Sequence, residues 1–270
     1  TPRDIHFATD AITDHALEFL DTARKTDRPW LLYTGYQAPH FPVQAPPALS
    51  ATYDKIYEKG WDVLRAERLE RMKKMGLAPS GLPLSPRGPI DDTNVARKHG
   101  SMTDDGMNPA WESLPQDRRA DLARRMAVYA AMVEGMDSNI GRIVDSLRSN
   151  GELENTLILF LSDNGACAEW EPFGFDLNPA DYSKNAPGHG INNYTPGKPN
   201  HLHTGGELAE MGGPGSLFSY GSAWANLSNT PLSNYKHYTD EGGIRTPMIA
   251  HWPKGIGKPG IANRVSHVMD

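Results

Sequence analysis

The segment that most constrains the fold is TLILFLSDNG at residues 156–165. Its large apolar and β-branched residues run without polar alternation, which is typical of a strand buried on both faces of an α/β sheet. Ligands in such sheets gather beyond the carboxyl ends of the strands, and this end carries a carboxylate, Asp163, beside an amide oxygen, Asn164. These oxygens suit a hard cation such as Ca²⁺ or Mg²⁺, and Gly165 allows a sharp turn. An Asx turn after a buried strand accounts for the same residues more simply.

Helical and extended patterns alternate along the rest of the chain. Apolar side chains recur at helical spacing in residues 9–24 and again in residues 119–147, after which Asn150-Gly151 provides a C-cap. Residues 30–36 and 247–252 are short apolar runs that predict strands. This alternation of helix and strand indicates an α/β protein.

Two long stretches do not fit this layered pattern. Residues from about 51–112 contain a predicted helix at Trp61–Met75 closed by Gly76 and continue as proline- and glycine-rich chain, so we interpret them as an insertion. Residues from about 167–229 form a connection far longer than usual, which indicates an active-site loop. Its aromatic residues favour an ordered loop: Trp170, Phe173, Phe175, Tyr182, Tyr194 and Phe218.

Composition narrows the classes of partner and cofactor. The 27 basic and 33 acidic residues give a net charge of −6, which leaves no basic field for nucleic acid and no polybasic patch for a membrane. No apolar run approaches the roughly 18 residues of a membrane span, and the first residues lack the apolar core of a signal peptide. The single cysteine, Cys167, excludes an internal disulfide and a multi-cysteine zinc site. These numbers leave the compartment and the oligomeric state open.

Two further segments carry polar groups beside predicted strands. In QAPHFP, prolines on either side of His40 restrict the backbone that presents its imidazole. In NYKHYTDEGGIRTP, a glycine pair permits close backbone packing just before a strand, and Lys236 lies upstream of it. A loop histidine bonded to a backbone carbonyl and a solvated lysine are the simpler interpretations of these two residues. For His201 and His203 in the long loop we expect solvated side chains.

The segments APHFP, TLILFLSDNG and NYKHYTDEGGIRTPMIAHWP, in this order, closely resemble formylglycine-dependent sulfatases of the arylsulfatase branch, in the alkaline phosphatase superfamily. The resemblance extends through GWDVLRAERLERMKKMGLAP, RRMAVYAAMVEGMDSNIGRI and SYGSAWANLSNTPLSNYKHY, so it covers nearly all of the chain. It implies a three-layer α/β/α sandwich with a mostly parallel central sheet. Residues 1–270 are then expected to be a partial catalytic domain, truncated at both ends, with the insertion and the active-site loop described above.

The resemblance implies a role for each polar group. Asp163 and Asn164 match two ligands of the active-site cation, usually Ca²⁺, with Mg²⁺ as the alternative. His40 matches the histidine that contacts the sulfate ester, and Lys236 matches the lysine that binds a sulfate oxygen and the leaving-group oxygen. A cation and a lysine suit a reaction that holds an anionic group and develops charge on a departing oxygen. The implied substrate is an aryl sulfate or a sulfated carbohydrate, and the implied location is periplasmic or secreted.

The nucleophile of that family is not encoded in this chain. It is a formylglycine made from the motif C/S-x-P/A-x-R, and the residues after Cys167, AEWE, do not fit that motif. The family's upstream pair of aspartates, which adds metal ligands, is also absent. Because Ca²⁺ takes about six to eight oxygens, we expect the formylglycine and the remaining ligands outside this chain, and we expect the chain alone to be inactive. Glu241 and Arg245 are expected to be structural.

Two other functions stay open at this point. A phosphodiesterase or phosphonate hydrolase of the same superfamily binds similar anionic oxygens, but zinc-dependent relatives are expected to show more histidine ligands, and Asn164 favours a sulfatase. A non-catalytic homologue could instead use the aromatic loop to bind sulfated glycans. The presence or absence of the C/S-x-P/A-x-R motif upstream would separate these functions.

Overall fold

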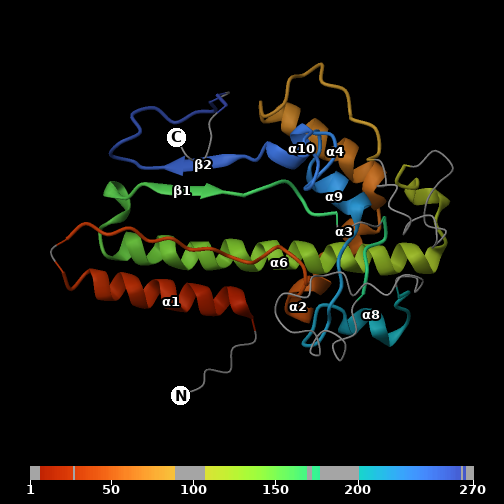
Figure 1. Cartoon of the computed structure of the whole chain (residues 1–270), viewed down its shortest axis with the longest axis horizontal. Coiled ribbons are helices and arrows are strands. Elements are labelled where there is room, and N and C mark those ends of the chain that lie inside the picture. The colour runs from red at the N-terminus through yellow and green to blue at the C-terminus, as the bar shows by residue number, and fades with distance from the viewer. Residues whose placement is uncertain are drawn as a thin grey trace.

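The computed structural model describes residues 7–26, 28–88, 107–168, 172–176, 201–262 and 264–265. Four elements frame these residues (Figure 1): α1 (Ala8–Ala23), α6 (Gln116–Ser149), β1 (Ile158–Leu161) and β2 (Met248–His251). The remaining elements are α2 (Pro47–Ala51), α3 (Asp54–Tyr57), α4 (Gly60–Lys74), η1 (Trp111–Ser113), η2 (Leu153–Asn155), α8 (Gly206–Glu210), α9 (Ser222–Ser228) and α10 (Glu241–Ile244).

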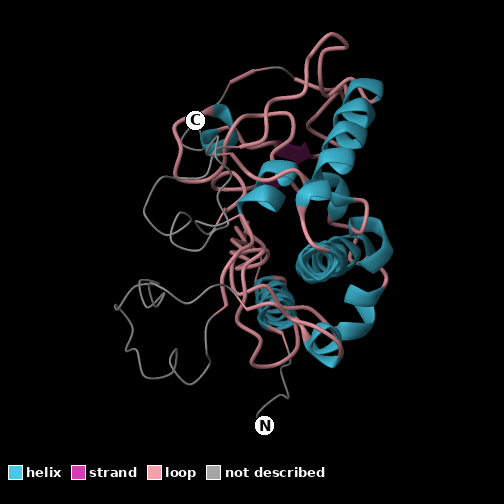
Figure 2. Ribbon diagram, turned by 90° about the vertical axis from the view of Figure 1, so that its right-hand side faces the viewer, coloured by secondary structure: helices cyan, strands magenta, loops and turns pink. Residues whose placement is uncertain are grey.

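The helix α6 is the longest of these elements, with 34 residues. In Figure 1 it runs between α1 on one side and the strands β1 and β2 on the other. Figure 2 looks along α6 and α1 and shows the two helices side by side. At their contact the amide of Asn139 donates to the carboxylate of Asp10 at 2.7 Å, and Arg142 pairs with Asp14 at 2.5 Å. Polar side chains therefore set the register of the two helices.

The core is built around three tryptophans. Trp61 of α4, Trp111 of η1 and Trp224 of α9 pack ring against ring, with centroids 4.7 Å, 5.2 Å and 5.5 Å apart. The indole of Trp61 donates to the carbonyl of Pro109 at 3.0 Å. The indole of Trp224 donates to the carbonyl of Leu122 in α6 at 2.9 Å. Because these rings bury a large apolar area with both donors satisfied, they hold α4, α6 and α9 together.

The structure confirms several elements that the sequence predicts. Helix α1 matches the pattern in residues 9–24, and α6 contains the pattern in residues 119–147 and ends one residue before Asn150. Helix α4 ends at Lys74, and Gly76 then adopts a φ of 72° that favours glycine. The strand β2 lies inside the predicted range 247–252. None of the helices in the described ranges combines the length and the apolar character that crossing a membrane requires.

The described strands form one antiparallel pair. In it Ile158 lies opposite His251 and Leu161 lies opposite Met248. This pair is compatible with the expected, mostly parallel sheet, because an otherwise parallel sheet commonly carries an antiparallel edge strand. Residues 30–36, a predicted strand, are extended and alternate between exposed and half-buried, but no backbone hydrogen bond joins them to another described residue.

The predicted strands at residues 30–36, 156–161 and 247–252 are more exposed than the sequence indicates. The side chain of Leu31 is 94% exposed, that of Tyr33 is 90% exposed, and those of Leu159 and Ile249 are 52% and 60% exposed. The prediction of a β1 covered on both faces is therefore not met by the residues that the structure describes. Exposed apolar area of this extent is the kind of surface that other protein segments bind.

The isolated 270-residue chain is expected to self-associate and to bind the dye ANS, because its apolar strands are open to solvent. Replacing Leu31 and Tyr33 together by lysine should reduce both effects several-fold. Sedimentation velocity and ANS fluorescence are the measurements. Phe19→Lys, which removes an exposed aromatic side chain from α1, is the control. A wild-type chain that stays monomeric and does not increase the fluorescence of ANS would contradict the expectation.

Candidate functional site

The end of β1 forms a turn that leaves two oxygen-bearing side chains unengaged. The hydroxyl of Ser162 donates to the backbone oxygen of Asn164 at 2.9 Å, and the hydroxyl of Thr246 donates to the carbonyl of Ser162 at 2.8 Å. Asp163 is exposed, Asn164 is half-buried, and within the described ranges no residue hydrogen-bonds to either side chain. The simpler interpretation, an Asx turn, does not hold, because the amide two residues after each side chain donates elsewhere: that of Gly165 to the Gly243 carbonyl and that of Ala166 to Asn229.

Three glycines let the turn pack directly on the backbone before β2. A Cβ atom at Gly165 would lie 1.7 Å from the carbonyl oxygen of Gly242, and one at Gly242 would lie 2.1 Å from that of Asn234. A Cβ atom at Gly243 would lie 2.0 Å from the carbonyl oxygen of Tyr238. Real side chains do not fit at such distances, so this contact requires glycine. The amide of Gly165 also donates to the carbonyl of Gly243 at 3.0 Å.

The structure brings His40 and Lys236 into contact. The Nζ atom of Lys236 lies 3.3 Å from Nε2 of His40, and Nδ1 of His40 lies 2.9 Å from the carbonyl oxygen of Phe41. A proton on Nδ1 satisfies the Phe41 carbonyl and leaves Nε2 as the acceptor for the lysine ammonium. We assign this tautomer from the hydrogen-bond partners. The backbone carbonyl and the lysine therefore share one imidazole.

A backbone hydrogen bond connects the lysine to the segment that follows the turn. The backbone amide of Lys236 donates to the carbonyl of Ala166 at 2.9 Å. Ala166 lies two positions after Asn164, so the pair predicted to bind metal and the pair predicted to contact sulfate belong to one continuous region. Glu241 and Arg245, which the sequence analysis assigns a structural role, pair with each other at 2.6 Å across α10.

Sequence analysis missed Asn229. This residue caps the C-terminal end of α9, and its side chain amide touches the segment after β1 and the two segments that flank Lys236. Its surroundings in the sequence, ANLSNTP, carry no periodic or motif signal for such contacts. Only the fold reveals it, because its partners lie between 5 and 63 residues away along the chain.

The donor set fits a hard cation only in part. Asp163 and Asn164 supply one carboxylate and one amide oxygen, the ligand types that Ca²⁺ and Mg²⁺ prefer. Within the part of the chain that the structure describes, no group of three or more histidine, cysteine, aspartate or glutamate residues is arranged to hold a metal ion. Since Ca²⁺ needs about six to eight oxygens, these two residues account for a fraction of a shell.

The long loop is held to α6 by a buried charge network. The side chains of Asp121 and Arg125 are both fully buried, and Arg125 pairs with Asp121 at 3.1 Å and with Asp176 at 2.7 Å. His203 lies against the same carboxylate, with Nδ1 2.8 Å from Asp121. The expectation of a solvated His203 is therefore wrong, because its imidazole is bonded to the carboxylate of Asp121, 82 residues away in the sequence. His201 is 54% exposed and faces Glu207 at 3.3 Å, so for it the expectation holds.

The charges of this network perturb one another. Burial alone would raise the pKa of the Asp121 carboxyl, but Arg125, His203 and Arg118 outweigh it, so this pKa lies below its ordinary value. Burial alone would lower the pKa of the Arg125 guanidinium, but Asp176 and Asp121 raise it above its ordinary value. Asp121 and Arg125 therefore remain charged at neutral pH.

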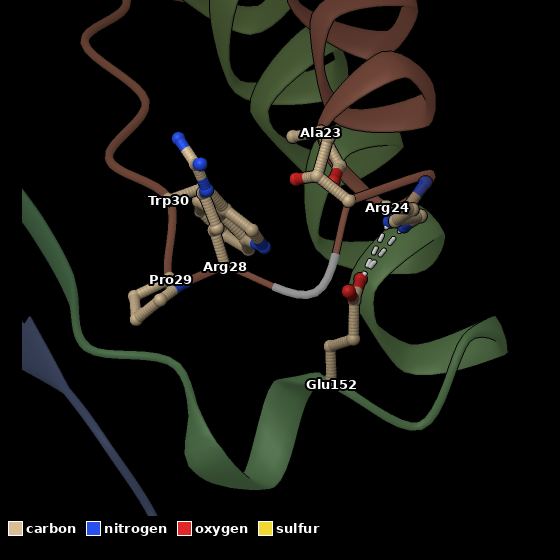
Figure 3. Close-up of a pocket in the computed structure, with 7 residues that line it drawn as sticks. Ala23, Arg24, Arg28, Pro29, Trp30 and Glu152 are labelled. Carbon is tan, nitrogen blue, oxygen red and sulfur yellow. Dashed lines mark hydrogen bonds and ion pairs between the residues drawn. The ribbon is translucent and has the colours of Figure 1, made fainter.

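A hollow of about 390 Å³ lies away from these residues. Its lining includes Arg24, Arg28, Trp30 and Glu152 (Figure 3), and the guanidinium of Arg24 pairs with the carboxylate of Glu152 at 2.7 Å. Glu152 precedes β1, whereas the candidate site follows it. The hollow is therefore at the opposite end of the strand and is not part of the candidate site.

Comparison with known proteins gives a consistent result. The sequence model of the family described as Sulfatase matches residues 5–270. An uncharacterized sulfatase of Schizosaccharomyces pombe is 33% identical over 251 residues, which are 92% of this chain and 38% of the relative. An arylsulfatase of Klebsiella aerogenes is 30% identical over 239 residues, which are 88% of this chain and 43% of the relative. The chain thus spans less than half the length of these relatives.

Among solved structures, that of Ps i-CgsB in complex with k-i-k-neocarrahexaose is similar to this chain with a TM-score of 0.40 and 22% sequence identity. The similarity covers 92% of this chain and 28% of that chain.

Asp121→Asn is expected to destabilise the protein by about 3–5 kcal/mol, because it leaves the buried Arg125 without one of its counter-charges. The pKa of the Asp121 carboxyl is lower in the folded protein than in the unfolded chain, so its ionised form stabilises the fold. This stabilisation is complete above the unfolded-state pKa of about 4 and is lost as the pH falls through the lower folded-state pKa. Urea unfolding from pH 7 to pH 3 should therefore show a shallower acid loss in the variant. Asp145→Asn on the same helix, in an exposed pair with Arg148, is the control and should change little.

Gly165→Ala is expected to displace the turn after β1, because the added Cβ meets the Gly242 carbonyl at 1.7 Å. Overpacking of this kind costs about 1–3 kcal/mol. Gly141 lies in the middle of α6, where an added Cβ atom would have no neighbour within 4 Å. Gly141→Ala should therefore stabilise the protein by about 0.5–1 kcal/mol. Thermal unfolding of both variants is the measurement. Equal stability of the two alanine variants would contradict the close contact.

Proposed function

Since this chain belongs to the sulfatase family, we propose that it is part of an enzyme that hydrolyses sulfate monoesters. The family has the alkaline-phosphatase-like α/β fold expected from the sequence. The observation that carries the proposal is the contact between Lys236 and His40, joined through Ala166 to the turn that bears Asp163 and Asn164. One ammonium, one imidazole and two oxygen ligands suit an anionic ester.

Lys236 and His40 are proposed to hold the sulfate ester during the reaction. Hydrolysis forms a bond between sulfur and an oxygen that ultimately comes from water, and it breaks the bond between sulfur and the ester oxygen. The ester oxygen leaves with the bonding electrons and takes a proton that also comes from water. The ammonium of Lys236 would bind a sulfate oxygen and neutralise charge on the departing oxygen. Because Phe41 engages Nδ1 of His40, Nε2 is the nitrogen that faces the ester. Both groups favour the transition state, in which the departing oxygen gains charge.

Asp163 and Asn164 are proposed to hold the divalent cation that sulfatases generally use, with Ca²⁺ favoured and Mg²⁺ as the alternative. The support is chemical: both side chains are oxygen ligands that are not engaged elsewhere among the described residues. When bound, the cation would supply positive charge that attracts the sulfate group. We propose that the other ligands and a formylglycine nucleophile belong to the part of the relatives' length that this chain does not span, and that the chain alone is inactive.

The proposed substrates are aryl sulfates or sulfated carbohydrates. The arylsulfatase of Klebsiella aerogenes supports the first class. The aromatic side chains of the long loop support a carbohydrate, because rings of this kind can pack on sugar faces: Phe175 packs on Phe41, next to His40, with ring centroids 4.9 Å apart. The chemistry of the reacting group is the same in both classes.

Lys236→Ala in the full-length protein is expected to lower kcat on an aryl sulfate by about 10²–10³-fold, because the variant loses the charge that stabilises the departing oxygen. Steady-state kinetics on an aryl sulfate and on the matching aryl phosphate are the measurement. Lys254→Ala, at an exposed turn beyond β2, is the control and should retain full activity. Unchanged sulfate turnover in Lys236→Ala, or faster hydrolysis of the phosphate by the wild type, would refute the proposal.

Asp163→Asn in the full-length protein is expected to weaken Ca²⁺ binding by at least about tenfold, since one anionic ligand becomes neutral. Calorimetric titration with Ca²⁺ after chelator treatment is the measurement. Asp137→Asn, at an exposed position of α6, is the control. Equal Ca²⁺ affinity in the two variants would remove Asp163 from the metal site.

A further inference from the structure

We infer that Asn229 is the positioning residue that holds the Asp163–Asn164 turn in register with Lys236. The inference rests on the function proposed above and adds a residue that acts on that site without touching the ester. Asn229 lies at the C-cap of α9, half-buried behind the turn. Its role follows from three hydrogen bonds, from its anchorage and from the chemistry of its amide.

The side chain of Asn229 bonds to three separate backbone segments. Its Oδ1 accepts from the amide of Ala166 at 3.0 Å. Its Nδ2 donates to the carbonyl of Asn234 at 2.9 Å and to that of Gly242 at 2.7 Å. These bonds reach the segment that follows the turn, the segment that leads to Lys236 and the glycine pair before β2. One amide group thus joins three backbone segments of the site.

The bond to Ala166 is the one that couples the turn to the lysine. Both backbone groups of Ala166 are hydrogen-bonded. Its amide donates to the side chain of Asn229, and its carbonyl accepts from the amide of Lys236 at 2.9 Å. A movement of this single residue therefore shifts Lys236 and, two positions earlier, Asn164. Without Asn229 the turn would still be held by the backbone bond between Gly165 and Gly243 and by the Thr246 hydroxyl at Ser162, but the Ala166 amide would lose its partner.

The anchorage of Asn229 is rigid. Its backbone amide donates to the carbonyl of Ala225 at 3.0 Å, which fixes it at the C-cap of α9. Five residues earlier, Trp224 is fully buried in the tryptophan cluster and bonded to Leu122 of α6. The position of the amide is therefore set by the protein core, and a side chain with few rotatable bonds carries that position to the site.

The chemistry of the contact selects asparagine. Two backbone carbonyls and one backbone amide face the same point, so the side chain must donate twice and accept once from one planar group. Aspartate would turn a carboxylate oxygen toward two carbonyl oxygens, and leucine would leave all three groups without this partner. Loss of a residue that orients metal ligands typically weakens metal binding by about 10–100-fold.

A matched control exists on the same helix. Asn226 lies one turn before Asn229, and its amide is 2% exposed and accepts from the backbone amide of Gly88 at 3.2 Å. Among the described residues, its side chain makes no hydrogen bond to the turn or to the segments on either side of Lys236. Asn229→Leu and Asn226→Leu both replace a polar amide of α9 by an apolar group of similar size, but only the first releases the site.

The test uses the full-length protein and three readouts: Ca²⁺ affinity by calorimetry, kcat and KM on an aryl sulfate, and hydrogen exchange in peptides that contain residues 162–168 and 233–243. For Asn229→Leu we expect Ca²⁺ affinity to fall by about 10–100-fold, kcat to fall more than KM rises, and amide protection in both peptides to drop. Asn226→Leu should lose thermal stability without these changes. If Asn229→Leu is too unstable to purify, Asn229→Ala, which leaves room for water, provides the same comparison.

Equal Ca²⁺ affinity and equal exchange in the two leucine variants would overturn the inference. The hydrogen-exchange readout needs neither metal nor substrate, so it decides on Asn229 even if the sulfatase function fails. Conversely, full sulfate turnover in Lys236→Ala would refute the proposed function while leaving the exchange result on Asn229 intact. A loss of affinity in Asn229→Leu that Asn226→Leu does not share supports the positioning role.

Discussion

The contact between Gly165 and the pair Gly242-Gly243 is the constraint on which the candidate site depends. Backbone meets backbone there with no room for a Cβ atom, so the turn after β1 and the approach to β2 are fixed relative to each other. The antiparallel pairing of β1 with β2 continues the same contact along the strands. Lys236 lies beside the turn because its backbone amide donates to the carbonyl of Ala166, just after the turn.

The tryptophan cluster provides the rigid base for this contact. It joins α4, a helix in the stretch interpreted as an insertion, to α6 and α9. The charge network of Asp121 and Arg125 holds the other side of α6 to the described parts of the long loop. Chemistry at the surface is thus supported by two different kinds of interaction, apolar ring packing and buried ion pairs, attached to one helix.

Local patterns were enough to predict α1, α4, α6 and β2, because helical periodicity and short apolar runs reflect nearby residues only. The sequence also singled out Asp163, Asn164, His40 and Lys236, which the structure brings into one region. What failed depends on distant residues. The extended segment at 30–36 makes no backbone hydrogen bond to a described residue, and the His203 imidazole bonds to a carboxylate of another element. Strand direction and the contacts of a lone amide are likewise properties of the fold, and no window of sequence contains them.

The partner of Lys236 in this structure is a neutral imidazole, and this has a consequence for ligand exchange. A lysine already paired with a carboxylate would give up a charge-assisted hydrogen bond before it could take an incoming anion. Among the described residues, the hydrogen-bond partner of the Lys236 ammonium is Nε2 of His40, an uncharged acceptor. An anion that binds Lys236 would therefore displace a neutral group and would break no ion pair.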